Sequence, residues 1–446
     1  MNISRRGFLK SSAAFIASSS FDLPMYKSLI RYYDGATLLN SLTQTVTNGD
    51  VIDLPDENIL GFPSAGWFVT GSGELFSGQY TVTGNTDFYA AKIIEISAAE
   101  QLDNVRYNLA GFYRLTKDIS LSSYCNWMPI GTDKRPFSGR FYGNGHIVSD
   151  LKINRKTEKP VGLFGHIKYG RITDLVLQNV DIEGGQFTGG IVGELEGSWG
   201  GFPLNEQELA VIDGLIMNCY VDGNIRAFSD DYNIGYIGIV AGGVVGYSMG
   251  TLSNCHSKAI VSSFSHKSDS LSGGIAGYSG CSVIEKCHWS GTVYSSGHNA
   301  YSGGITGVAD FGILNCSSIG HIYSTSSGAS SYSGGIAGYL NDFSVLNCQS
   351  AGNISSISYP RYYSFSNLPE PSYAGGIVGY SGGNVTEFRA CSIQNCCSSG
   401  NIAAHSSLSG SYSGAITGDM KDTEINNCIS TENITPPSPL DTEENV

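Results

Sequence analysis

The sequence predicts an all-β protein whose main part is a right-handed parallel β-helix, a solenoid of stacked coils. One phrase, a Gly-Gly-aliphatic-x-Gly turn followed by an Asn-Cys pair, recurs seven times with minor variations, and successive copies start 53, 31, 30, 31, 41 and 39 residues apart. A period of about 20 to 50 residues is typical of one supersecondary unit stacked on itself. Helix-period patterns are almost absent, and glycine reaches 58 of 446 residues because the repeats are rich in turns.

Each repeat also carries the same apolar pattern around its cysteine. The residues three before and six after it are aliphatic, the second after it is usually Ser, and the fourth is usually Gly. Cysteine and its even-numbered successors share one face of a strand, which predicts a small, tightly packed inward face. Stacking would place the cysteines about 4.8 Å apart as a ladder of free buried thiols. The ladder comprises Cys219, Cys255, Cys287, Cys316, Cys348, Cys396 and Cys428.

Two further predictions concern the residues beside this ladder. Asn precedes the cysteine in six of the seven copies, and Lys286 takes its place in the third. We expect this Asn at a bend, with its side-chain amide bonded to the next coil along the stack. Cys125, Cys281, Cys391 and Cys397 lie off the ladder, and the sequence leaves open a Cys281–Cys287 or a Cys391–Cys397 disulfide.

The first residues predict export. Ser4–Lys10 reads Ser-Arg-Arg-Gly-Phe-Leu-Lys, and a short, weakly apolar stretch follows over Ser11–Ser20. This segment resembles the twin-arginine signal, which implies a prokaryotic protein exported already folded to the cell surface, the periplasm or the medium. We assign residues 1–33 to the signal and a linker. The sequence contains no apolar run of about 18 residues or more, so it predicts no transmembrane helix.

Residues 34–92 differ from the repeats. They alternate apolar and polar residues, with turn sequences at Asn48-Gly49-Asp50 and Gly84-Asn85. Through Val51–Pro55, Gly66-Trp67-Phe68 and Tyr80–Ala90, this stretch resembles the internalin-type B repeat. The resemblance implies a small β-grasp module of the kind found in bacterial surface proteins.

Residues 94–435 resemble the GLUG-repeat family. The resemblance rests on the seven repeats and on a leader that contains Trp127–Gly131, Pro136–Val148 and Val161–Gly165. It implies a β-helix of bacterial surface proteins, including adhesins and non-catalytic parts of IgA-degrading metallopeptidases. Residues 436–446 are rich in proline and acid, which predicts a disordered tail.

Catalytic and metal motifs are not evident in the sequence. His-Glu-x-x-His is missing, and two Gly-x-Ser-x-Gly strings, around Ser248 and Ser381, fall in the repeat turn. His256 and His288 follow ladder cysteines without a third ligand, and Asp310, Asp342 and Asp422 are interpreted as turn residues. We therefore expect no catalytic residue, metal or cofactor. The net charge of −14 disfavours nucleic acid and anionic membranes as partners.

Aromatic insertions give the best candidates for recognition. One repeat carries Glu196–Phe202 before its Asn-Cys pair, and another carries Ser358–Tyr373. Insertions in repeat proteins form loops on one face, where exposed Tyr, Trp and Arg favour binding. The candidate ligand-binding residues are Trp199, Phe202, Tyr359, Arg361, Tyr362 and Tyr363. Tyrosine also follows the Gly turn in four repeats, which we interpret as structural stacking, at Tyr247, Tyr278, Tyr339 and Tyr380.

These observations predict a non-enzymatic, adhesin-like binding protein that recognises a host or neighbour-cell protein or glycan through the flank of the β-helix. Two alternatives stay open. A polysaccharide lyase or hydrolase can be built on the same fold, because a fold does not fix function. A purely structural stalk would need no aromatic patch at all.

Overall fold

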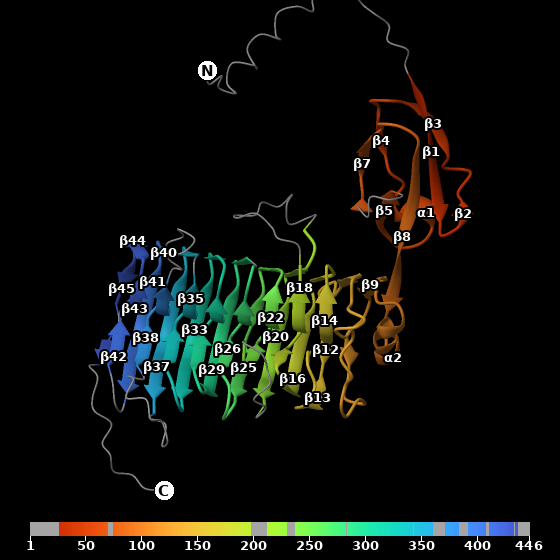
Figure 1. The fold of residues 1–446 in the computed structure, drawn as a ribbon. Helices are drawn as coiled ribbons and strands as arrows, with labels where there is room; N and C mark the ends of the chain where they lie inside the picture. Colours follow the sequence, from red (N-terminus) through yellow and green to blue (C-terminus); the bar gives the residue numbers. More distant parts are fainter. Residues whose placement is uncertain are drawn as a thin grey trace, which may run out of the picture. The chain divides into compact units, whose positions relative to one another are not determined.

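The computed structural model describes residues 26–69, 75–197, 212–229, 237–281, 283–341, 343–359, 371–382, 391–406, 410–431 and 433–435. The chain divides into two compact units, Met1–Ile93 and Ile94–Val446 (Figure 1). No helix among the described residues is long and apolar enough to cross a membrane.

The first unit is a small mixed β structure with a single helical turn. Strand β1 pairs antiparallel with β3 and parallel with β8, and β5 pairs antiparallel with β8. The elements are β1 (Lys27–Asp34), β2 (Thr37–Leu38), β3 (Gln44–Thr47), β4 (Val51–Asp53), α1 (Glu57–Leu60), β5 (Ser64–Val69), β6 (Leu75–Phe76), β7 (Gln79–Thr81) and β8 (Thr86–Ile96).

The core of this unit forms around aromatic rings. Tyr32 stacks on Phe88 with ring centroids 5.4 Å apart, and Trp67 meets Tyr32 edge-on at 4.9 Å. Ile30 and Tyr32 are fully buried on β1. The linker predicted up to residue 33 therefore ends earlier, because strand β1 already begins at Lys27.

The second unit confirms the predicted parallel β-helix. It opens with α2 (Ala99–Asp103) and a 3-10 turn, η1 (Asn104–Tyr107), and then builds four parallel sheets from coils stacked in chain order (Figure 1). In a typical coil, the strand before the Gly-Gly turn belongs to sheet 1 and the strand after this turn belongs to sheet 2. The strand before the Asn-Cys pair belongs to sheet 3, and the long strand after this pair belongs to sheet 4.

Sheets 1 and 2 meet at the Gly-Gly turns. Sheet 1 consists of β17 (Phe187–Gly189), β21 (Ile239–Gly242), β26 (Ser270–Gly273), β30 (Ala300–Gly303), β34 (Ser331–Gly334), β38 (Ser372–Gly375) and β42 (Ser411–Gly414). Sheet 2 consists of β14 (Phe164–Lys168), β18 (Val192–Glu196), β22 (Val245–Met249), β27 (Ala276–Ser279), β31 (Thr306–Ala309), β35 (Ala337–Asn341), β39 (Val378–Gly382) and β43 (Thr417–Lys421).

Sheets 3 and 4 meet at the Asn-Cys pairs. In this unit sheet 3 consists of β9 (Phe112–Leu115), β11 (Arg140–Tyr142), β15 (Arg171–Thr173), β19 (Leu215–Met217), β23 (Thr251–Ser253), β28 (Ile284–Glu285), β32 (Ile313–Leu314), β36 (Ser344–Leu346), β40 (Cys391–Gln394) and β44 (Thr423–Asn426). Sheet 4 consists of β10 (Ile119–Ser120), β12 (Ile147–Ser149), β13 (Lys152–Arg155), β16 (Val176–Gly184), β20 (Tyr220–Phe228), β24 (His256–Ser257), β25 (Ile260–Phe264), β29 (His288–Gly297), β33 (Ser317–Ser326), β37 (Gln349–Ser358), β41 (Cys397–Ser406), β45 (Ile429–Ser430) and β46 (Asn433–Thr435).

The cysteine ladder forms as predicted. Its first six members are buried, Cys428 is half-buried, and all eleven cysteines are free thiols. The thiols donate to carbonyl groups of the preceding coil, as Cys316 Sγ does to Ile284 at 3.6 Å. The two disulfides that the sequence left open are not formed, and Cys397 is exposed whereas Cys391 is buried.

The asparagine ladder is also confirmed. Each Asn before a ladder cysteine has a left-handed backbone with φ between 50° and 56°, and Lys286 has φ 53°. Asparagine tolerates this conformation better than most residues. Its amide then donates to the Asn one coil earlier, from Asn254 to Asn218 at 2.8 Å and from Asn395 to Asn347 at 3.0 Å. Lys286 has no side-chain amide, so it interrupts the row of hydrogen bonds between asparagine side chains.

The Gly-Gly turn is required by the stacking of coils. A Cβ at Gly335, the second glycine of its turn, would lie 2.0 Å from the carbonyl oxygen of Gly376 in the next coil, and a Cβ at Gly243 would lie 2.0 Å from that of Gly274. Backbone atoms therefore occupy the space that a side chain needs. The seventh copy carries Ala415 at this place, and the described part of the chain stacks no further coil on it.

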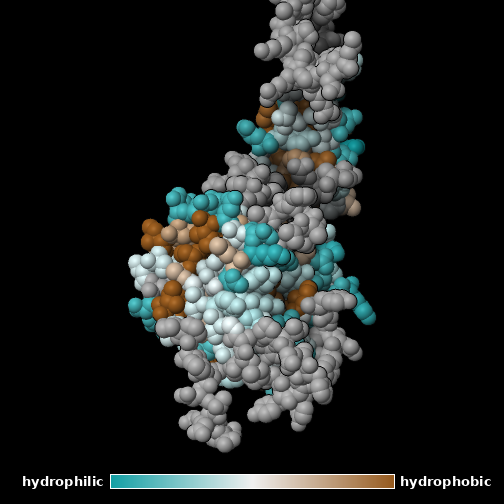
Figure 2. Space-filling view, turned by 60° about the vertical axis from the view of Figure 1, so that its left-hand side comes forward, coloured by the Kyte–Doolittle hydropathy of each residue, from teal (hydrophilic) through white to brown (hydrophobic). Residues whose placement is uncertain are grey.

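Inward-facing apolar side chains are covered along the solenoid but not at its C-terminal coil. Met420, Ile429 and Ile434 are 48%, 65% and 44% exposed. Figure 2 brings this end of the solenoid forward and shows brown, hydrophobic areas beside pale and teal ones. Met420 and Ile434 occupy inward positions of the repeat and are exposed because no further described coil stacks on them, whereas Ile429 faces outward.

Candidate ligand-binding surface

The structure describes one of the six residues predicted to bind a ligand. Tyr359 is 45% exposed and directly follows β37, where its backbone N–H donates to Ser326 at 3.1 Å. The other five predicted residues lie outside the described ranges: Trp199, Phe202, Arg361, Tyr362 and Tyr363. Ser358 Oγ donates to the carbonyl of Pro371 at 3.0 Å. The second insertion thus leaves and rejoins the solenoid at one point, immediately before β38.

A column of tyrosines runs along the outside of sheet 1 next to that point. Its members stand in register two residues before the first glycine of each turn, at Tyr301, Tyr332, Tyr373 and Tyr412. Successive ring centroids are 4.8, 5.0 and 5.1 Å apart, with interplanar angles of 2°, 8° and 13°. The parallel register therefore stacks these rings almost face to face.

A second column lies on sheet 2, where a tyrosine directly follows the third conserved glycine of the turn in four repeats. Tyr247 stacks on Tyr278 at 5.1 Å, and Tyr339 stacks on Tyr380 at 5.3 Å. The predicted stacking of these four tyrosines is therefore seen as two pairs, because Val308 stands between them in the register.

The two columns touch across the Gly-Gly turn. Tyr332 meets Tyr339 at 5.6 Å and Tyr373 meets Tyr380 at 5.2 Å, with interplanar angles of 84° and 66°. Edge-to-face contacts of this kind are favourable for aromatic pairs. They join the rings into one aromatic surface, the tyrosine strip, which comprises Tyr301, Tyr332, Tyr339, Tyr373, Tyr380 and Tyr412.

The chemistry of the strip is that of neutral phenols. Burial raises the pKa of Tyr339 to about 12, and the neighbouring Tyr380 and Tyr332 add to this effect. Burial likewise raises the pKa of Tyr332 and of Tyr373. These hydroxyls stay protonated at neutral pH and can both donate and accept hydrogen bonds. The rings turn their faces to one another, so the strip offers edges and hydroxyls to a ligand.

The raised pKa values predict a loss of stability in alkali. For Tyr339 the pKa rises from 10.0 when unfolded to about 12 when folded, so its stabilising contribution is complete below pH 10 and is lost as the pH rises toward 12. We expect a loss on the order of 1 kcal/mol for each such tyrosine, since remaining solvent contact screens part of the effect. Urea midpoints measured across this pH range test the expectation.

The matched variant for this test is Tyr339→Phe, which keeps the ring and removes the titrating hydroxyl. The variant should lose less stability between pH 10 and pH 12 than the parent protein. A phenolate absorbance titration with all tyrosines ionising near pH 10, while the protein remains folded, would contradict the prediction.

The sequence contains a signal for the sheet 1 column. In each of the last four Gly-Gly turns, tyrosine occurs two residues before the first glycine, in the pattern Tyr-[Ser/Ala]-Gly. Alternation along a strand places this tyrosine on the face opposite its small neighbour. The buried Ser333 and Ala374 fix which face is inward, so Tyr332 and Tyr373 face out.

Five of the residues considered for catalysis or metal binding make contacts within the solenoid, whereas Asp342 lies outside the described residues. Ser248 and Ser381 are fully buried, and Ser248 Oγ donates to the carbonyl of Gly250 at 3.0 Å. Asp310 accepts a hydrogen bond from the Tyr278 hydroxyl. The rings of His256 and His288 are 5.9 Å apart, and His288 Nδ1 faces Ser317 Oγ at 2.7 Å.

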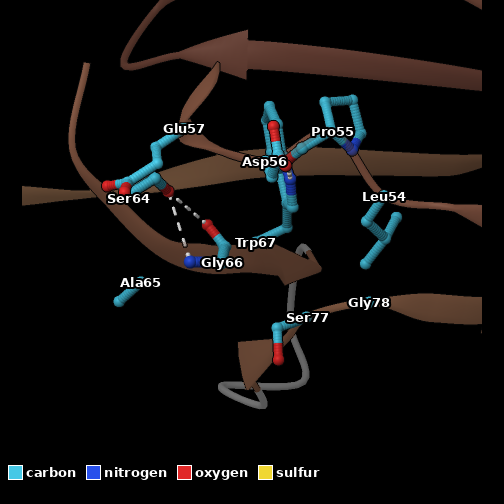
Figure 3. Close-up of a pocket in the computed structure, with 10 residues that line it drawn as sticks. All are labelled: Leu54, Pro55, Asp56, Glu57, Ser64, Ala65, Gly66, Trp67, Ser77 and Gly78. Atoms are coloured by element: carbon cyan, nitrogen blue, oxygen red, sulfur yellow. Dashed lines mark hydrogen bonds between the residues drawn. The ribbon is translucent and has the colours of Figure 1, made fainter. Parts of the chain in front are cut away.

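A small pocket in the first unit is a weaker candidate. Figure 3 shows it between Pro55, Asp56, Ser64 and Trp67, with a volume of about 150 Å³. The Trp67 indole N–H donates to the carbonyl of Pro55 at 2.8 Å and so belongs to the structure of the pocket wall. Ligand pockets usually measure about 300 to 1,000 Å³, so this one fits only a very small group.

Comparison with known proteins identifies partial similarities. No family model matches the sequence. A stretch of 138 residues is 30% identical to halomucin of Haloquadratum walsbyi, and the match covers 28% of this chain but 2% of halomucin. A solved structure from Bacteroides ovatus, provisionally described as an immunoglobulin A1 protease, is 22% identical over 58% of this chain and 76% of its own, with a TM-score of 0.42. The resemblances to the GLUG-repeat family, the B repeat and the twin-arginine signal stay predictions.

Proposed function

We propose that this protein is an exported surface protein that binds an extended glycan along the tyrosine strip. The observation that carries the proposal is the strip itself: a row of neutral phenols repeated every 4.8 to 5.1 Å on the outside of the solenoid. A periodic surface suits a periodic ligand, and this spacing is close to the length of one sugar unit in an extended polysaccharide.

The composition of the strip supports a neutral polar ligand. Tyrosine offers apolar contact area and a hydrogen-bonding hydroxyl at a low cost in conformational entropy. Ser and Gly, with small polar or no side chains, surround the rings in the repeat turns. Sugars present hydroxyl groups and C–H faces together, which matches ring edges alternating with hydroxyls.

The position of the second insertion adds support. Tyr359 and Pro371 bring its two ends to the start of β38, next to Tyr373. The predicted binding residues Arg361, Tyr362 and Tyr363 belong to that insertion. The partial similarity to halomucin and the twin-arginine-like start of the sequence support export to the surface.

The test is binding of the purified protein to a glycan array, followed by affinity measurements with the polysaccharides that bind. We expect Tyr332→Ala combined with Tyr373→Ala to weaken binding about tenfold or more, equivalent to about 1.4 kcal/mol. Tyr332→Phe combined with Tyr373→Phe keeps the stack and separates the hydroxyl contribution from the ring contribution.

The control variant is Tyr323→Ala, since Tyr323 is 37% exposed on sheet 4 and lies outside the strip. The proposal would be wrong if the Tyr332→Ala, Tyr373→Ala double variant bound the glycan as tightly as the parent, or if the Tyr323→Ala control lost as much affinity as the double variant. Release of new reducing ends or unsaturated sugars from a bound polysaccharide would instead favour the lyase or hydrolase alternative. Absence of any glycan binding would favour a protein ligand or a stalk.

A further inference from the structure

A histidine surrounded by carboxylates lies at the N-terminal end of the solenoid, on sheet 2. His166 stands on β14 and pairs in register with Glu194 on β18, while Asp133 comes from the turn between Thr132 and Arg135. Single ligand atoms of Asp133, His166 and Glu194 all lie within 4.8 Å of one another. The His166 side chain is 6% exposed, whereas that of Asp133 is 55% exposed.

Both ring nitrogens of His166 face carboxylate oxygens. Nδ1 lies 3.5 Å from Asp133 Oδ1, and Nε2 lies 3.2 Å from Glu196 Oε1. Both nitrogens are shielded from solvent, and neither makes a hydrogen bond to another described residue. A neutral imidazole has one N–H and one lone pair. One of the two nitrogens would then direct its lone pair at a carboxylate, which is repulsive unless a cation lies between them.

The surroundings distinguish the two nitrogens. Glu196 is held by Lys168, whose Nζ lies 2.6 Å from Oε2, so its other oxygen is fixed opposite Nε2. A carboxylate in this position favours the proton on Nε2 and orients the ring. The lone pair of Nδ1 is then directed toward Asp133. Glu194 adds another, partly buried carboxylate to this side, and His166 and Lys159 are the positively charged or basic groups that act on it.

We propose that Asp133, His166 and Glu194 bind a divalent transition-metal ion, with Glu196 and Lys168 orienting the imidazole. An imidazole beside two carboxylates is a donor set for zinc, manganese or iron; calcium and magnesium prefer oxygen ligands alone. Because the three ligands come from three successive levels of the stack, the ion ties the first turn of the solenoid to β14 and β18.

No sequence motif marks this site, because its ligands lie in three separate coils. Register pairing places His166 beside Glu194, and the fold of the leader brings the turn with Asp133 to them. The alternative is a protonated His166 paired with Asp133 and Glu196, which would place positive charge between the carboxylates without a metal.

The experiment is calorimetric titration of the chelator-treated full chain with Zn²⁺ and with Mn²⁺. We expect one saturable site and a rise in the unfolding temperature on binding. Asp133→Asn and Glu194→Gln should each weaken binding about tenfold or more, an effect of the size seen when metal-site interactions are removed. Co²⁺ bound in place of Zn²⁺ should give visible absorption bands that the two variants lose.

The matched control is His146→Gln. His146 Nδ1 lies 3.1 Å from Asp118 Oδ1, and within the described part of the chain this pair belongs to no group of three possible metal ligands. This variant should bind metal like the parent. Because Asp133 is exposed, Asp133→Asn is expected to fold normally even if His166→Gln does not. Failure of the parent to bind either ion saturably, or equal weakening in His146→Gln, would overturn the proposal in favour of the protonated histidine.

Discussion

Replacing Gly335 with alanine is expected to destabilise the solenoid by about 3 kcal/mol or more, at the upper end of the range for overpacking substitutions. The added Cβ would lie 2.0 Å from the Gly376 carbonyl oxygen and 2.0 Å from Ser350 Oγ. Since the first contact is with backbone of the next coil, the stack must open to relieve it. Guanidinium unfolding followed by circular dichroism measures the effect.

Hydrogen exchange should place the damage at one level of the stack. In a solenoid each coil contacts only its neighbours, so protection should fall around residues 335 and 376 and persist in distant coils. Ala415→Gly is the matched control, because it changes the same place in a turn on which no described coil stacks, and its effect should be within about 1 kcal/mol. A Gly335→Ala protein as stable as the parent would contradict this account of the Gly-Gly turn.

Replacing Trp289 with serine is expected to cost about 3 to 5 kcal/mol, the range for removing a large buried aromatic side chain. Trp289 occupies the second position after a ladder cysteine, where Ser257, Ser318, Ser350 and Ser398 stand in other coils. The substitution therefore restores the commonest residue of the repeat and still destabilises. The indole is fully buried and its N–H donates to the Ala259 carbonyl at 3.3 Å.

The reason is that the coils have adapted to this one large side chain. A Cβ on Gly274 would lie 2.2 Å from the indole, and one on Gly320 would lie 3.0 Å from it. Serine would leave a cavity that rigid neighbouring coils cannot close. Ser318→Ala is the control, expected to lose about 1 kcal/mol with its hydrogen bonds to Gly335 and Ser350. A smaller loss in Trp289→Ser than in Ser318→Ala would show that the interior repacks.

Trp289 also illustrates a feature of the interior that the repeat pattern does not predict. The consensus predicts a small inward residue, and only the stacked neighbours explain how a tryptophan fits. Similarly, the sequence predicts a linker up to residue 33, where the structure has most of strand β1, because the local pattern gives no indication of its pairing with β3 and β8. Pairing between distant segments is a tertiary property, and local patterns carry little information about it.

The sequence by itself determined the parallel β-helix, its cysteine and asparagine ladders, and its inward face, because a repeat imposes one local structure and one register on every coil. Only the tertiary structure decided which outward residues meet. Tyr332 and Tyr339 touch because the Gly-Gly turn brings sheets 1 and 2 together, and Asp133 reaches His166 and Glu194 because separate coils stack at the N-terminal end. Contacts between sheets and between coils depend on geometry that one repeat, read alone, does not contain.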